Sequence, residues 1–155
     1  MISPPAGNNL STLAAPEENF GIVNGFINFV GNNLKKSEYL RRVITYSHYF
    51  KDFKRTISRE ALTKVYQVLL LIMTEEIIPA KYFKAIVNVK GLYEIRVMES
   101  GNIYRIFCCF DEDCLVVLLS GFQKKTQKTP KKEIEKAERL MNEYLEKKHR
   151  LHKND

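Results

Sequence analysis

The chain has 155 residues, enough for one domain that folds without disulfides or a metal. With 45% apolar and 28% charged residues, its composition excludes a largely disordered protein. Its net charge of +7 is uneven, because two lysines against three glutamates give −1 over residues 1–39 and leave +8 for the rest. Charge of this kind attracts polyanions, and on charge alone a polyanionic partner and a solvated surface fit equally well. The three cysteines and three histidines lack metal-ligand spacing and no segment reaches the ~18 apolar residues of a membrane span, so we expect a cytoplasmic protein with structural thiols and no metal.

Residues 1–40 are predicted to form an N-terminal extension to the main domain. Residues 1–16 are rich in proline, glycine and asparagine and hold few bulky side chains, so we expect a flexible tail. From Phe20 onward, apolar residues recur at spacings of three and four, which predicts an amphipathic helix over residues 18–36. This helix is expected to dock on the domain itself. Dimerisation, or an origin in upstream or vector-derived translation, are the alternatives.

Residues 41–155 are predicted to form the main domain, which begins with a short strand and two helices. β-Branched residues and a tyrosine over residues 43–46 indicate the strand. Aromatic side chains on one side of residues 49–53 indicate a short helix. Ser58 can cap a longer helix with a 3.6-residue apolar period, which ends before Pro79.

Three strands and a final helix are predicted to follow. The strands are expected at residues 92–98, 103–110 and 115–120, and short polar connections favour their pairing as antiparallel hairpins. A lysine-rich loop then leads to the helix, with Thr129 as its N-cap and Pro130 in its first position. The expected fold class is α+β: a small antiparallel sheet, formed by this meander and the N-terminal strand, packed with two N-terminal helices and a C-terminal helix.

Arg105 is the most informative residue, because it occupies a position where strand alternation predicts burial. It alternates with Ile103, Phe107 and Cys109 in an otherwise apolar strand. An unpaired arginine inside a sheet is strongly destabilising. Arg105 must therefore pair with a carboxylate such as Glu94 or face a cleft that holds an anionic ligand. The residues alone favour the ion pair.

Four segments together carry a resemblance to a known family. They read GLYEIRV at 91–97, IYRIF at 103–107, LLSGFQKKTQKTP at 118–130 and EIEKA at 133–137. In order and spacing they resemble the phage-derived HigB-like branch of the RelE/ParE toxin superfamily. The predicted order of helices and strands over residues 42–147 is also similar to that of this superfamily, and residues 1–40 lie outside the resemblance.

The resemblance implies the toxin of a type II toxin–antitoxin pair that inhibits translation. Such toxins are endoribonucleases that cut mRNA in the ribosomal A site, through attack of a ribose 2′-hydroxyl on the adjacent phosphate. They need no metal or other cofactor. The implied protein partner is a helix-turn-helix antitoxin of the HigA type, and operator DNA is bound only through that antitoxin.

Basic side chains carry this chemistry in RelE-like toxins, and the resemblance assigns it to the matching positions of this chain. The arginines would bind the scissile phosphate as planar, bidentate donors, and the lysines would hold flanking phosphates or act as the general acid. A solvated loop is the alternative for the lysines. The implied catalytic residues are Arg96, Arg105, Lys124 and Lys125. The implied RNA-binding residues are Lys124, Lys125, Lys128, Lys131 and Ser120.

Two positions depart from the family pattern and leave the general acid and base open. Ser120 stands where close relatives have a histidine, and Glu94 stands where RelE has a lysine. A serine hydroxyl cannot shuttle a proton near neutral pH. Tyr93 and Tyr104 alternate onto the face opposite the arginines, which favours a place in the core. His48 is expected at the surface of the first helix or partly packed.

Two other functions fit the same pattern. ParE-like proteins share the fold but inhibit DNA gyrase without cutting RNA. They usually lack a basic cleft, so Arg96, Arg105 and the lysines favour the nuclease. The other alternative is a catalytically degenerate homologue that binds RNA or the ribosome, because Ser120 replaces the usual histidine.

Overall fold

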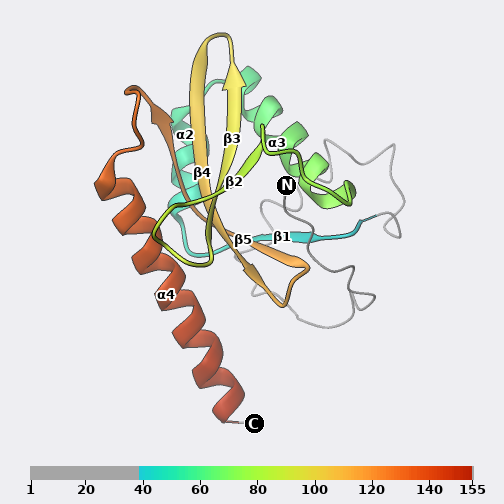
Figure 1. Cartoon of the computed structure of the whole chain (residues 1–155), viewed down its shortest axis with the longest axis vertical. Coiled ribbons are helices and arrows are strands. Elements are labelled where there is room, and N and C mark those ends of the chain that lie inside the picture. The colour runs from blue at the N-terminus through green and yellow to red at the C-terminus, as the bar shows by residue number, and fades with distance from the viewer. Residues whose placement is uncertain (1–38, 155) are drawn as a thin grey trace.

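Residues 39–154 are described by a computed structural model, in which they form five strands and three helices (Figure 1). The strands are β1 (Arg42–Thr45), β2 (Phe83–Ala85), β3 (Leu92–Glu99), β4 (Asn102–Asp111) and β5 (Leu115–Lys124). The helices are α2 (Tyr49–Thr56), α3 (Arg59–Thr74) and α4 (Lys131–Lys153). The flexible tail and the helix predicted over residues 18–36 lie outside the described residues.

The strands form one sheet in the order β1-β5-β4-β3-β2. β3, β4 and β5 are the predicted antiparallel meander. β1 pairs with β5 in parallel, so the sheet is mixed, and the predicted α+β class is confirmed with this one parallel pair in it. The sequence did not predict β2. Only Phe83 of its three residues is buried, so the strand is too short to show the alternation of apolar and polar residues that identifies a strand.

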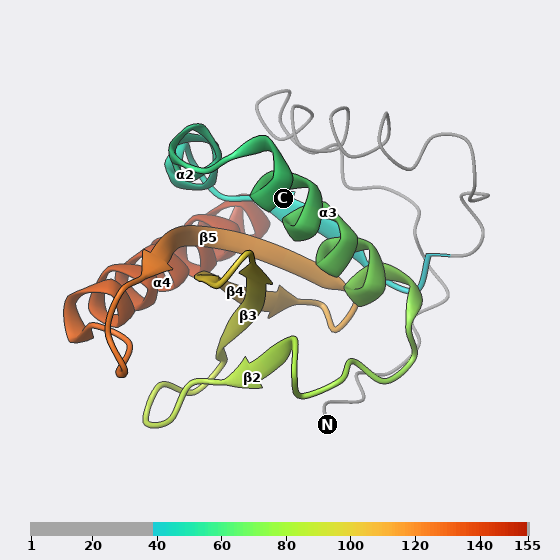
Figure 2. The ribbon, with the colours of Figure 1, turned by 90° about the horizontal axis from the view of Figure 1, so that it is seen from above.

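Helices cover both faces of the sheet, and each face has its own apolar core. Figure 2 shows α2 and α3 on one face and α4 on the other. Val65, Leu69 and Ile72 of α3 belong to the core on the first face, which we call the α3-side core. Ala137 and Leu140 of α4 belong to the core on the second face, the α4-side core. The sheet is thus a layer between two sets of helices, and side-chain alternation along each strand decides which core a residue joins.

Neighbouring cysteines on β4 illustrate this alternation. Cys108 joins the α3-side core and Cys109 joins the α4-side core. Burial raises the pKa of Cys109 to about 12 and raises the pKa of Cys108 well above its ordinary value. Both thiols stay protonated near neutral pH and pack as small apolar groups, as the sequence predicts.

Both ends of α3 are fixed by hydrogen bonds. Ser58 is the predicted N-cap, and its hydroxyl accepts from the backbone N–H three residues later at 3.1 Å. At the other end, the Arg41 side chain is only 3% exposed. It donates to the backbone carbonyls of Ile72, Glu75 and Glu76 at 2.8, 2.7 and 2.9 Å. The carbonyl of Ile72 is in the last turn of α3, where carbonyls lack intrahelical partners, and Glu75 and Glu76 follow the helix, so Arg41 joins the start of β1 to the end of α3.

α4 is the longest helix, and it begins one residue later than predicted. Its first residue is Lys131, and Pro130 occupies the N-cap position without a side-chain hydrogen bond. Thr129 therefore does not have the capping role that the sequence suggested. None of the described helices is long and apolar enough to cross a membrane.

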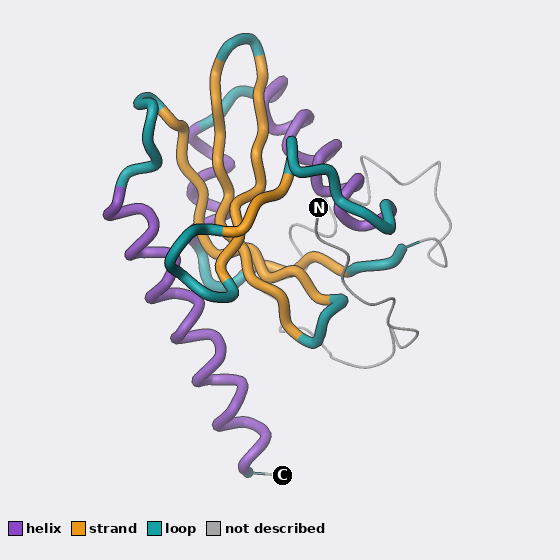
Figure 3. The backbone as a smooth tube through the Cα atoms, viewed as in Figure 1, coloured by secondary structure: helices purple, strands orange, loops and turns teal. Residues whose placement is uncertain are grey.

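The far part of α4 is anchored to the turn between β4 and β5. Asp111 is 4% exposed and accepts from the Tyr144 hydroxyl at 2.6 Å and from Nζ of Lys148. Lys148 also contacts Glu112 at 3.1 Å. Burial, and then the hydrogen bond to Asp111, raise the pKa of Tyr144, so the phenol remains a donor. Residues 149–154 continue past this anchor and are exposed (Figure 3).

We expect Gly121→Ala to destabilise the domain, because α2 packs directly on β5 at this residue. A Cβ at Gly121 would lie 2.7 Å from Cδ1 of Phe53, and the Phe53 ring is itself buried. Overpacking of this kind should lower the free energy of unfolding by about 1–3 kcal/mol, measured by urea denaturation. In a double-mutant cycle, Phe53→Leu should relieve part of the loss. Strictly additive losses would contradict the steric explanation.

Candidate nucleic-acid interface

Three charged side chains lie together on the α4 side of the sheet. On β3, Glu94 and Arg96 alternate onto the face of Leu92, and on β4 Arg105 alternates onto the face of Phe107; both apolar residues belong to the α4-side core. Arg96 and Arg105 are register partners, so the two cations lie opposite each other on neighbouring strands. Like charges in this position destabilise a sheet unless an anion is close by. We call Glu94, Arg96 and Arg105 the charged cluster.

Glu94 supplies that anion. Its Oε1 lies 3.5 Å from Nε of Arg96, and its Oε2 lies 3.8 Å from Nε of Arg105. Glu94 and Arg105 are 7% and 6% exposed, whereas the Arg96 side chain keeps 34% of its surface exposed. The ion pair of Arg105 with Glu94, which the residues alone favoured, is confirmed, and the carboxylate is shared with Arg96. Two cations and one carboxylate leave the cluster with net positive charge.

Arg105 has a donor that the described protein leaves unused. Its Nη1 donates to the backbone carbonyl of Tyr104 at 3.2 Å. Its Nε has no hydrogen-bond partner, because the contact with Glu94 is too long for a hydrogen bond. Burial and repulsion from Arg96 lower the pKa of Arg105 and Glu94 raises it, yet a guanidinium stays charged at physiological pH. An anion that reached Arg105 would meet a charged donor free to bind it.

Ser120 adds a second unsatisfied group on the same face. It pairs with Phe107, next to a register shift, and Phe122 pairs with Arg105, so Ser120 and Arg105 are diagonal neighbours on adjacent strands. Ser120 is 1% exposed and its Oγ has no hydrogen-bond partner. Over residues 39–154, three buried side-chain atoms lack such a partner, and the third belongs to Arg41, at the end of α3. Because buried polar groups are normally satisfied, two such atoms on diagonal neighbours make this part of the sheet a candidate position for a bound water or a ligand group.

The predicted lysines lie at the end of β5 and in the segment that follows it. Lys124 is the last residue of β5 and not part of the following loop, because β5 extends beyond its predicted end. Strand alternation places it on the same face as Arg105. Lys125 and Lys128 are exposed in the connection to α4, and Lys131 is exposed at the first position of that helix. The structure therefore brings Lys124 onto the sheet face and places Lys125 and Lys128 in the connection and Lys131 at the start of α4.

The other groups considered for proton transfer lie elsewhere. Tyr93 and Tyr104 pack with the α3-side core, as their alternation predicts. His48 is exposed immediately before α2, with its Nδ1 2.7 Å from the Asp52 carboxylate, so its expected surface position is confirmed. No group of three or more histidine, cysteine, aspartate or glutamate side chains between residues 39 and 154 is arranged to hold a metal ion.

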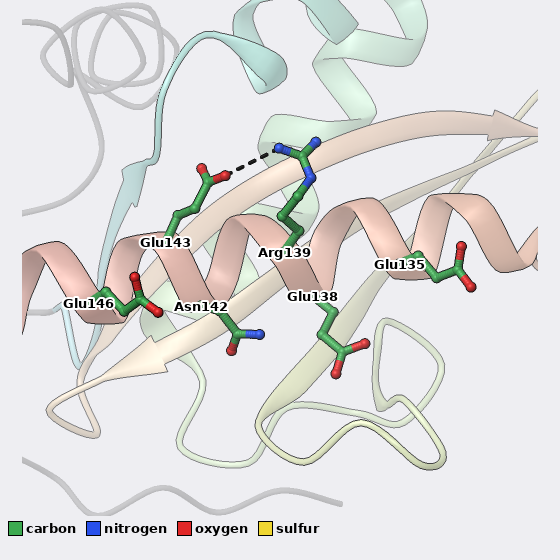
Figure 4. Close-up of a pocket in the computed structure, with 6 residues that line it drawn as sticks. All are labelled: Glu135, Glu138, Arg139, Asn142, Glu143 and Glu146. Carbon is green, nitrogen blue, oxygen red and sulfur yellow. Dashed lines mark hydrogen bonds and ion pairs between the residues drawn. The ribbon is translucent and has the colours of Figure 1, made fainter.

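The outer side of α4 carries a shallow depression that is acidic, in contrast to the cationic face of the sheet (Figure 4). The one cation in its lining, Arg139, donates to Glu143 at 3.2 Å. Four carboxylates against one guanidinium would repel a polyanion, so the cationic face is the candidate surface for RNA. The depression is lined by Glu135, Glu138, Arg139, Asn142, Glu143 and Glu146.

The fold and the charged cluster together define a class: a small, basic α+β domain of RelE-like fold, with cations on the α4 side of a mixed sheet. Residues 49–142 match the family described as phage-derived Gp49-like proteins (DUF891), and the chain belongs to this family. It is a toxin-like family related to the RelE and HigB toxins. The match runs from α2 into α4 and includes the charged cluster and the four lysines. A comparison with curated proteins gives no match.

Proposed function

We propose that this protein is the toxin of a type II toxin–antitoxin pair, a HigB-like endoribonuclease that cleaves mRNA on the ribosome without a metal or other cofactor. The observation that carries the proposal is the pairing of Arg96 with Arg105 on one sheet face, where Nε of Arg105 has no hydrogen-bond partner. Lys124 and the unsatisfied hydroxyl of Ser120 share that face. The family's relation to RelE and HigB toxins and the positive charge of the chain support the same conclusion.

The proposed reaction is attack of a ribose 2′-oxygen on the adjacent phosphorus. The O2′–P bond forms as the 2′-hydroxyl gives up its proton to water or a neighbouring base, and the P–O5′ bond breaks as the 5′-oxygen takes up a proton, which leaves a 2′,3′-cyclic phosphate and a 5′-hydroxyl. Arg96 and Arg105 would stabilise the added negative charge of the phosphorane. Lys124 and Lys125 would hold flanking phosphates or protonate the leaving 5′-oxygen. The ribosome would hold the mRNA so that the 2′-oxygen lies in line with the breaking bond.

The proposed protein partner is a helix-turn-helix antitoxin of the HigA type, through which the complex would bind operator DNA. An acidic or apolar segment of that antitoxin would cover the charged cluster and exclude mRNA. Met98 supports this arrangement, because it is 62% exposed and alternates onto the same face as Arg96. Antitoxin and mRNA would then compete for one surface.

Cell-free translation tests the proposed activity directly. Addition of the purified protein to a translating extract should produce new mRNA 5′ ends within the reading frame, mapped by primer extension, while the same mRNA without ribosomes stays intact. Cleavage of naked mRNA at the same rate would contradict ribosome dependence. Intact mRNA with inhibited gyrase supercoiling would identify a ParE-like activity, and stalled translation without cuts would identify a degenerate, ribosome-binding homologue.

A further inference from the structure

We infer that Glu94 is a built-in competitor of RNA phosphate, a carboxylate that occupies the anion position between Arg96 and Arg105 and must be displaced before a phosphate can bind them. The inference rests on the proposed function and adds to it a control on which anions the site accepts. A single phosphate would have to replace the carboxylate alone. An RNA strand would also contact the lysines beyond β5, and this additional binding energy would help it to displace Glu94.

The contacts of Glu94 are those of a replaceable counterion. Its two oxygens lie 3.5 and 3.8 Å from the Nε atoms of Arg96 and Arg105, distances that give attraction between charges without a good hydrogen bond. Nε of Arg105 consequently remains without a hydrogen-bond partner. A phosphate oxygen at ordinary hydrogen-bond distance would satisfy this donor, and the carboxylate in its present position does not.

Burial makes the competition strong. Glu94 is 7% exposed, so water screens its charge little, and its attraction for the neighbouring guanidinium groups is larger than that of a surface carboxylate. The same charge repels an approaching phosphate. Removing the charge while keeping the shape, as in Glu94→Gln, should therefore favour phosphate both by freeing the arginines and by ending the repulsion.

Lys84 offers Glu94 a second partner. Lys84 on β2 is the register partner of Glu94 on β3, so the two side chains are cross-strand neighbours on the same face of the sheet. Lys84 is exposed, and no ion pair joins it to Glu94 in the described structure. When a phosphate takes the two arginines, rotation of the Glu94 side chain toward Lys84 would leave the displaced carboxylate paired, which lowers the cost of the exchange.

Binding of a non-cleavable, 2′-O-methylated oligonucleotide to the full chain, followed by fluorescence anisotropy, tests this inference. Glu94→Gln should bind at least about tenfold more tightly than the wild type. Glu99→Gln is the matched control: it makes the same change of charge at the end of the same strand, where the carboxylate accepts from Ser100, and it should change binding less than about threefold. Equal effects of the two variants, or weaker binding by Glu94→Gln, would overturn the inference.

Two further variants, Lys84→Gln and Arg105→Gln, and one control keep the test decisive if Glu94→Gln folds poorly. Lys84→Gln should weaken binding, because the displaced carboxylate would lose its second partner, by more than the exposed control Lys81→Gln does; equal losses would count against the exchange. Arg105→Gln separates the inference from the function on which it rests. If Arg105→Gln binds the oligonucleotide as tightly as the wild type does, the proposed RNA site is wrong, whatever the effect of Glu94→Gln on binding.

Discussion

Arg105→Ala should lower the rate of ribosome-dependent mRNA cleavage by at least about a hundredfold, because loss of one donor directed at developing charge commonly costs 10²–10³ in rate. Arg105 is the buried cation of the charged cluster, and its Nε makes no hydrogen bond, so a phosphate oxygen that displaced Glu94 could bind it. The measurement is single-turnover cleavage of ribosome-bound mRNA, together with colony formation after induction. Arg105→Lys should be intermediate, because it keeps the charge and loses the planar, two-donor geometry.

The control for this prediction is Arg139→Ala. Arg139 is an exposed arginine on the acidic outer side of α4, paired with Glu143, so its removal makes the same change of charge away from the cluster. It should leave cleavage within about threefold of the wild type. Arg105→Ala should also fold, because Glu94 retains Arg96 as its partner. A folded Arg105→Ala protein that cleaves at the wild-type rate would remove the charged cluster from the mechanism.

The sheet faces could be predicted because alternation along a strand depends only on local sequence. The period of two in β3 places Glu94 and Arg96 on one face and Tyr93 on the other, and the structure has them there. The same reasoning marks Arg105 as a cation in a buried position and Glu94 as its partner. Hydrophobic periodicity also located the helices, including the capping role of Ser58.

What local sequence did not reveal depends on contacts between distant segments. β5 continues to Lys124 because its last residues pair with β4, although GFQK has little strand character of its own. The parallel pairing of β1 with β5 likewise follows from tertiary packing. The sharing of Glu94 between both arginines and the unsatisfied Ser120 hydroxyl follow from the β3–β4–β5 register. Whether RNA reaches this cluster stays a prediction.

Asp111→Ala should have the largest effect on stability, because it removes the acceptor that joins α4 to the β4–β5 turn. The Asp111 carboxylate is buried and accepts from both the Tyr144 hydroxyl and the Lys148 ammonium. Without it, the half-buried phenol of Tyr144 loses its acceptor, and the partly buried ammonium of Lys148 keeps only the exposed Glu112. Breaking a buried pair costs about 3–5 kcal/mol, and we expect the lower end of this range because Lys148 is 22% exposed and keeps Glu112 as a partner. Urea denaturation should therefore show a lower midpoint with an unchanged slope, since the same core still unfolds.

The neighbouring acid provides the control. Glu112 also contacts Lys148, at 3.1 Å, but its side chain is 61% exposed, so Glu112→Ala should cost no more than about 1 kcal/mol. Tyr144→Phe keeps the ring and loses only the hydroxyl, and it should fall between the two variants. Equal losses for Asp111→Ala and Glu112→Ala would mean that the anchor acts through surface charge alone. A loss confined to Asp111→Ala and Tyr144→Phe would place the stabilisation in the part-buried hydrogen bonds of Asp111. These lie at the β4–β5 turn, at the other end of the strands from the β3–β4 turn.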